Sequence, residues 1–331
     1  MLQLKQDIAN HTYKRCYLLY GEEGYLRKQY KDNLIADVVP EGDTMNYNSF
    51  SGDDVDVPAI IDLAETLPFF ADRRVILIED SGLCKSGGEQ LAEYLPDCPE
   101  TTLIIMVEAA VDKRSKLFKA VSTVGRACEF VVQQENTLRT WIKSKASKEG
   151  KTIDSAAISL LLERTGTDMM TISSEMEKLF SYTLEKKNID VGDVTNIVTV
   201  SSSSKVFDMI AAMAERKQAK ALEMYYDLLS HKETPYGILA LISRQFNMML
   251  QVKELRSMGY GSGQIAQKMG IAPFIEKKYE QQAAGFGMEK LRRALEACVE
   301  ADENVKIKSF DAKMCVELLI IEFSANEKSG K

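Results

Sequence analysis

The segment Tyr20-Gly21-Glu22-Glu23-Gly24 lies between a predicted strand and a predicted helix, where nucleotide-binding proteins place a phosphate loop. Such a loop needs the pattern Gly-x-x-x-x-Gly-Lys-Ser/Thr, because backbone amides surround the phosphates, the lysine neutralises them and the hydroxyl binds magnesium. Here no Gly-Lys-Ser/Thr follows, and the carboxylates of Glu22 and Glu23 would repel a phosphate. We therefore expect a plain strand-to-helix turn and no ATP-binding residues.

Glu79 and Asp80 follow the apolar run 75–78 and resemble an acidic, magnesium-holding strand end. Without a phosphate loop there is no nucleotide for them to serve, so we expect a solvated strand end. A degenerate ATPase that uses Glu79 or Asp80 stays open as an alternative function. The chain has only two histidines and no Cys-x-x-Cys pair, so we predict no catalytic residue, metal or cofactor.

Residues 264–273 resemble the start of a helix-turn-helix, with Gly270 at the turn. A DNA reader needs basic and amide side chains on its second helix. That helix offers Lys277 and Lys278, with Gln281 and Gln282, but it also carries Glu276 and Glu280. A helical hairpin inside a bundle is the plainer interpretation, and a DNA-binding regulator is the second alternative function.

Two adjacent aromatic residues, Phe69 and Phe70, fall on a predicted connector between a helix and a buried strand. The helix carries apolar residues at helical spacing from Val57 onward and is expected to end at Leu67, because Pro68 disfavours helical geometry before it. Connectors lie at the surface, where large apolar groups are unusual. Either the rings belong to the core or they are a plug for a partner's pocket. Arg73 and Arg74, which follow, are expected to be exposed.

The composition is that of an ordinary globular protein, with 331 residues, 45% hydrophobic and 27% charged. No apolar run approaches the roughly 20 residues needed to span a bilayer, and the start shows no secretory signal. We therefore expect a cytoplasmic protein with no membrane partner. The net charge is −7. The negative charge is concentrated in residues 1–135, and no part has the basic excess of a dedicated nucleic-acid binder.

Apolar strands alternate with helices through the first part of the chain, which predicts a parallel sheet covered on both faces. The strands are predicted at 16–20, 75–78, 103–107 and 127–132, with a further short strand near 45–50. After residue 133 the pattern becomes helical. We predict an α/β domain over 1–135, a small helical domain over 136–204 and an all-helical domain over 205–331. Residues 201–204, all serine, are expected to be a flexible link.

Several segments follow one another in an order that resembles the delta subunit of the bacterial DNA polymerase III clamp loader. They are Tyr17-Leu18-Leu19-Tyr20-Gly21-Glu22-Glu23, Leu67-Pro68-Phe69-Phe70-Ala71-Asp72-Arg73-Arg74-Val75 and residues 112–119, 166–168, 175–179, 206–208, 235–246 and 302–308. The likeness covers nearly the whole chain. No single motif is decisive, but the order and spacing together are fairly specific.

The resemblance implies an AAA+-like domain without a working ATP site, then a helical lid and a helical collar. It implies a non-catalytic part of the DNA polymerase III holoenzyme, which binds the sliding clamp and opens its ring for loading on primed DNA. Other clamp-loader subunits are expected to bind residues 205–331. The family's clamp-binding element is a hydrophobic pair on the loop before the second core strand, and it falls on Phe69 and Phe70, with Leu67 and Pro68 beside them. This sequence has Leu-Pro-Phe-Phe where the family pattern is a shorter Leu-Phe, so the pair that enters the clamp stays open.

Overall fold

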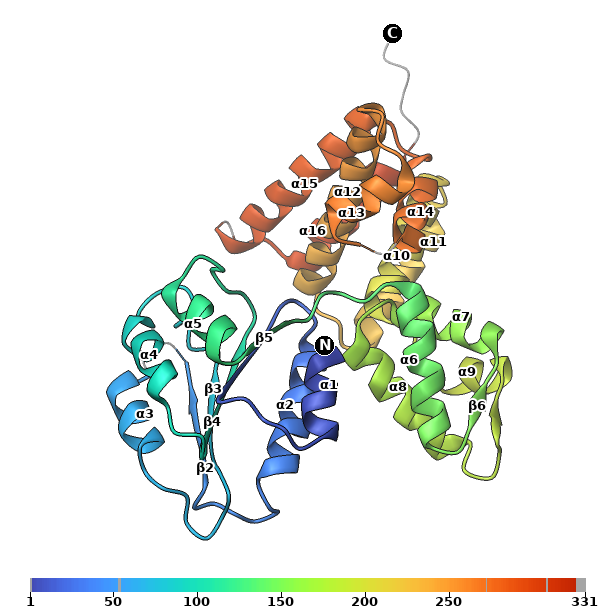
Figure 1. Cartoon of the computed structure of the whole chain (residues 1–331). Helices are drawn as coiled ribbons and strands as arrows, with labels where there is room; N and C mark the ends of the chain where they lie inside the picture. The colour runs from blue at the N-terminus through green and yellow to red at the C-terminus, as the bar shows by residue number, and fades with distance from the viewer. Residues whose placement is uncertain (1, 53–54, 272, 308, 326–331) are drawn as a thin grey trace. The chain divides into compact units, whose positions relative to one another are not determined.

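A computed structural model describes residues 2–52, 55–271, 273–307 and 309–325 of the chain (Figure 1). Contacts between residues divide the chain into two compact units, 1–132 and 133–331. The division into three domains, 1–135, 136–204 and 205–331, stays a prediction.

The first unit is built on a five-stranded parallel sheet with the strand order β2-β3-β4-β1-β5. All four pairings are parallel, with Ile76 beside Ile104 and Leu18 beside Met106 in the centre. The central strands consist almost entirely of buried apolar residues, as a sheet covered on both faces requires. The strands are β1 Cys16–Tyr20, β2 Tyr47–Ser51, β3 Arg74–Glu79, β4 Thr102–Glu108 and β5 Arg126–Glu129.

Helices cover both faces of this sheet, as the alternation of strands and helices predicts. Figure 1 shows α1 and α2 on one face and α3, α4 and α5 on the other. On the second face Ile60, Leu91 and Leu117 join the strand residues in one apolar cluster. The elements are α1 Leu2–Ala9, α2 Gly24–Val38, α3 Val57–Ala64, α4 Glu89–Tyr94, the 3-10 helix η1 Leu95–Asp97 and α5 Lys116–Val124. The predicted α/β parallel-sheet fold is therefore confirmed.

Two predicted boundaries in this unit are wrong, and each has a local cause. The helix α3 ends at Ala64 and not at Leu67, because the Thr66 N–H bonds to the Leu63 carbonyl three residues back, so a turn has replaced the α-helical pattern. The strand β5 ends at Glu129 and not at residue 132. The carbonyl of the next residue, Phe130, accepts a hydrogen bond from the N–H of Glu23 in the turn after β1. The pairing between β5 and β1 therefore ends there.

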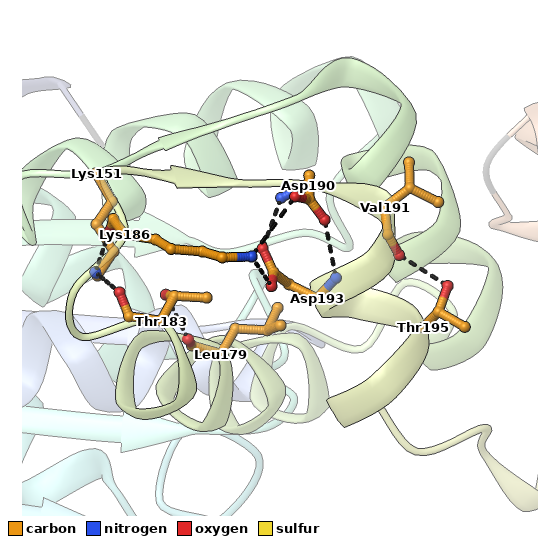
Figure 2. A network of polar contacts seen from close by, with 8 residues as sticks. All are labelled: Lys151, Leu179, Thr183, Lys186, Asp190, Val191, Asp193 and Thr195. Atoms are coloured by element: carbon orange, nitrogen blue, oxygen red, sulfur yellow. Dashed lines mark hydrogen bonds and ion pairs between the residues drawn. The ribbon is translucent and has the colours of Figure 1, made fainter.

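The first part of the second unit is helical but also contains a small parallel sheet that the sequence did not predict. Its elements are α6 Glu135–Lys148, β6 Thr152–Ile153, α7 Ser155–Thr165, α8 Met169–Tyr182, β7 Asn188–Ile189 and α9 Val191–Ile197. Figure 2 shows the polar contacts beside this sheet. Asp190 and Asp193 form a reciprocal capping box at the start of α9, and Lys186 lies 2.7 Å from the buried Asp193 carboxylate. These contacts join the end of β7 to α9.

The described residues between 202 and 324 form an all-helical bundle, as predicted. The helices are α10 Ser202–Ala214, α11 Gln218–Ser230, α12 Pro235–Ser257, α13 Ser262–Met269, α14 Pro273–Ala283, α15 Met288–Lys306 and α16 Ala312–Ser324. The expected flexible link at 201–204 is wrong. The Ser201 hydroxyl accepts a hydrogen bond from the N–H of Ser204, which makes Ser201 the N-cap of α10.

Among the described residues, no individual helix has the length and apolar character that crossing a membrane requires. The pair α9 and α10 passes that test by length and composition when taken together, with a bend of 94° between the two helices.

Candidate interaction site on the loop before β3

Residues 65–73 connect α3 to β3 and carry a small group of exposed apolar side chains. Phe70 is 95% exposed, Leu67 is 76% exposed and Phe69 is 56% exposed, while Pro68 is partly buried. The two phenylalanine rings meet edge to face, with centroids 4.6 Å apart and planes at 85°. The loop precedes a strand of a parallel sheet, so it lies at the amino-terminal edge of that sheet. Neither ring belongs to the core.

The backbone of Phe69 is held by the side chain of Asn46, which is only 2% exposed. The Asn46 amide nitrogen donates to the Phe69 carbonyl at 2.9 Å, and the Asn46 amide oxygen accepts from the Phe69 N–H at 2.6 Å. Asp43 orients Asn46, because its carboxylate accepts from both the Asn46 side chain at 2.7 Å and the Asn46 N–H at 3.0 Å. These bonds and the Arg74 charge keep the pKa of the Asp43 carboxyl below its ordinary value. The loop is therefore fixed at two backbone atoms.

Arg74 holds the beginning of the same loop, and the expectation that it is exposed is wrong. Its side chain is buried, with the residue 6% exposed. The guanidinium donates to the carbonyls of Thr66 at 3.2 Å and Leu67 at 3.4 Å, and on its other side to the carbonyl of Met45 at 3.1 Å. Five donors in a rigid planar fork suit arginine to this bridging role. The buried Asn46 and Arg74 are functional candidates that sequence reasoning missed.

Phe70 adopts a left-handed backbone conformation, with φ of 50°. For a residue with a side chain this conformation costs about 1–2 kcal/mol, and it persists when the surroundings determine it. The neighbouring Phe69 supplies that constraint, because both of its backbone polar groups are bound to Asn46. The loop therefore presents its rings in one defined arrangement.

The glycine-containing turn after β1 is held by contacts within the protein. The Glu23 carboxylate accepts a hydrogen bond from the Tyr25 N–H at 3.1 Å, so an anion of the chain itself occupies the N-terminus of α2. Gly21 lies against the Phe130 carbonyl so closely that a Cβ atom there would be 2.3 Å from the oxygen. The prediction of a plain strand-to-helix turn agrees with this geometry.

Two acidic residues at the carboxyl-terminal edge of the sheet, Glu79 and Glu108, are engaged within the protein. Lys31 lies 2.9 Å from the Glu79 carboxylate; burial alone would lower the pKa of Lys31, but Glu79 outweighs it and raises that pKa. Glu79 is therefore a paired, partly buried residue and not a solvated one, whereas Asp80 is exposed. The buried Glu108, which the sequence did not single out, accepts from the Ser81 N–H at 3.1 Å and from its hydroxyl at 2.6 Å. Among the described residues, no group of three or more His, Cys, Asp or Glu side chains is placed to hold a metal ion.

The segment that resembles a helix-turn-helix is a helical hairpin, α13 and α14, with Gly270 in a left-handed turn between them at φ of 65°. Two of the polar residues on its second helix point inward. Gln282 donates to the Phe207 carbonyl at 2.7 Å and accepts from Gln245 at 2.9 Å, and Glu276 is fully buried. Lys277 and Gln281 are exposed and Lys278 is partly buried. Gln282 therefore serves the packing of the bundle.

Comparison with known proteins gives one consistent result for both units. Residues 17–132 match the family model described as DNA polymerase III, delta subunit, and residues 203–323 match the model of the delta subunit's C-terminal domain. DNA polymerase III subunit delta of Bacillus subtilis is 28% identical over 326 residues, which cover 95% of this chain and 94% of that protein. The probable DNA polymerase III subunit delta of Aquifex aeolicus is 23% identical over 296 residues, 85% of this chain and 83% of that protein.

A solved structure supports the same assignment. The Bacillus subtilis DNA clamp loader delta protein superposes with a TM-score of 0.72 at 26% identity, covering 98% of this chain and 99% of that one. The resemblance drawn from the order of the sequence motifs is thus confirmed by the family models, by the relatives and by the fold. The chain belongs to the family of DNA polymerase III delta subunits, the clamp-loader components of the replication machinery.

Proposed function

We propose that this chain binds the sliding clamp through Leu67, Pro68, Phe69 and Phe70 and opens the clamp ring for loading on primed DNA. The observation that carries the proposal is the exposed edge-to-face pair of phenylalanines on a loop whose backbone is fixed by buried side chains. Contiguous exposed apolar side chains mark interaction sites. Rings already held in one arrangement lose less conformational freedom on binding than rings on a loose loop.

Ring opening follows if the plug, defined as residues 67–70, binds the clamp more tightly when one clamp interface is open. A ligand shifts such an equilibrium only by its difference in affinity for the two states. The chain supplies this binding energy without catalysis of its own. The turn after β1 lacks the lysine and hydroxyl of a phosphate loop, and Glu23 already occupies the N-terminus of α2. ATP therefore enters through other subunits of the loader.

Those subunits have a surface to bind on α16. This helix packs Val316, Ile320 and Phe323 into the core of its bundle, yet it also exposes Met314 and Leu318. Met314, Leu318 and Ile321 are all exposed and follow one another at helical spacing, so they form an apolar stripe outside the core of the bundle. The long apolar helix α12 is instead packed against α10, α14, α15 and α16 of its own unit. We therefore propose that a helical collar domain of another loader subunit covers α16.

Replacing Leu318 with glutamate tests this second contact. The charge should prevent assembly with the other loader subunits in size-exclusion chromatography, because it would be buried without a partner. Met258→Glu, at an exposed position after α12, is the matched control and should assemble normally. Normal assembly of Leu318→Glu would exclude this face of α16 as the contact.

The decisive test of clamp binding is the double variant Phe69→Ala/Phe70→Ala. Burying a phenylalanine side chain contributes about 1.5–3 kcal/mol, so losing both rings should weaken clamp affinity by about a hundredfold or more. The affinity would be measured by surface plasmon resonance on purified sliding clamp, without nucleotide. Leu184→Ala is the matched control, because Leu184 is an equally exposed apolar residue, 79% exposed, in the second unit. Unchanged affinity of the double variant would contradict the proposal.

A further inference from the structure

We propose that Asn46 is a positioning residue for the plug. The inference rests on the proposed clamp-binding function and goes beyond it, because it assigns a role to a buried polar residue that is distant in sequence and is not expected to touch the clamp. Asn46 is 2% exposed, and its side chain makes two hydrogen bonds to one residue of the plug, Phe69. A side-chain amide that bonds both the N–H and the carbonyl of one residue imitates a strand neighbour and fixes that residue's backbone.

Asn46 is itself rigidly held. Its carbonyl accepts from the Val75 N–H at 2.7 Å, at the start of the pairing between β2 and β3. Its side-chain nitrogen donates to the Asp43 carboxylate at 2.7 Å as well as to Phe69. The oxygen and the nitrogen of the amide therefore both have partners, and the amide orientation is determined. The Asn46 side chain therefore fixes the backbone of the plug relative to the sheet.

This constraint explains how Phe70 keeps a left-handed backbone with φ of 50° while its ring is almost fully exposed. Because the Phe70 ring is almost fully exposed, its edge-to-face contact with Phe69 offsets only part of this strain. When the bonds to Phe69 are lost, the backbone of Phe70 is free to return to the common regions with negative φ. That change redirects the ring and breaks the edge-to-face pair. Asn46 therefore acts on binding by pre-organising both rings.

The test compares Asn46→Ala with Asn33→Ala, an exposed asparagine on α2 of the same unit. The first readout is amide hydrogen exchange at Phe69, which should accelerate in Asn46→Ala while the amides of β3 and β4 keep their protection. The second is clamp affinity, which should fall about tenfold when two buried hydrogen bonds no longer order the plug. Asn33→Ala should change neither.

The outcomes separate this inference from the proposed function. If Phe69→Ala/Phe70→Ala loses clamp binding but Asn46→Ala keeps it, Asn46 does not position the plug and clamp binding stands. If the double variant keeps full affinity, the clamp-binding proposal is wrong, and the role of Asn46 in clamp binding is wrong with it. Should Asn46→Ala lose protection throughout the sheet, Asp43→Ala serves instead, because Asp43 lies nearer the surface and orients Asn46. It should accelerate exchange at Phe69 and weaken binding in the same direction by a smaller factor, and no change in either readout would overturn the inference.

Discussion

The two edges of the parallel sheet in the first unit differ in which groups have partners within the protein. At the carboxyl-terminal edge the acidic groups of Glu23, Glu79 and Glu108 each bind a donor of the protein itself. At the amino-terminal edge the backbone of the loop before β3 is satisfied by Asn46 and Arg74, and the apolar side chains of Phe69 and Phe70 are left in water.

Open parallel sheets bind their ligands outside the carboxyl ends of the strands. In this chain three carboxylates at that edge are already bound to donors of the protein, whereas the opposite edge exposes apolar area. Under the proposed function, the sheet serves as a rigid support for a hydrophobic contact at its amino-terminal edge.

The largest expected difference is between two phenylalanines, Phe130 beside the carboxyl-terminal edge and Phe70 on the plug. Phe130 is fully buried with its ring 5.3 Å from that of Tyr30, so Phe130→Ala should lower the free energy of unfolding by about 3–5 kcal/mol. Phe70→Ala should leave it almost unchanged, because the side chain is already in water. Urea unfolding of both variants measures the contrast. A similar loss in both would mean that the plug is ordinary core.

The central strands could be predicted because each is a continuous run of apolar residues. The strands predicted at 16–20 and 103–107 end within a residue of β1 and β4. The strands β6 and β7 were missed because two residues each carry no periodicity. Their pairing depends on tertiary contacts between segments about 35 residues apart.

The position of the plug could be predicted, but the exposure of its rings could not. The local run Leu67-Pro68-Phe69-Phe70 is compatible with core packing and with a surface plug alike. What decides between them is Asn46, which lies 23 residues before Phe69 in the sequence, and the buried Arg74 guanidinium. A polar residue just before a short strand and the second of two adjacent arginines carry no signal of that role. The resemblance to the delta family points to residues 67–70 without any of these contacts, and their role stays a prediction.

A smaller effect is expected from Glu108 at the carboxyl-terminal edge. Its carboxylate accepts from the Ser81 N–H and hydroxyl, so Glu108→Ala leaves buried donors without an acceptor. Such a loss costs about 1–3 kcal/mol of unfolding free energy. Glu108→Gln keeps an oxygen acceptor at nearly the same position and should cost less than the alanine variant. Equal, negligible costs in urea unfolding would show that Glu108 does not hold this edge together.

Wild type and Glu108→Gln also test whether negative charge alone keeps a nucleotide from binding at the carboxyl-terminal edge. Isothermal titration with Mg-ATP should show no binding to either. Removing one carboxylate lowers the local negative charge, but it supplies neither the lysine nor the hydroxyl that a phosphate loop needs. It also leaves the Tyr25 N–H at the start of α2 bonded to Glu23. Micromolar binding by Glu108→Gln alone would mean that repulsion is the whole barrier, and binding by the wild type would mean that both edges of the sheet accept ligands.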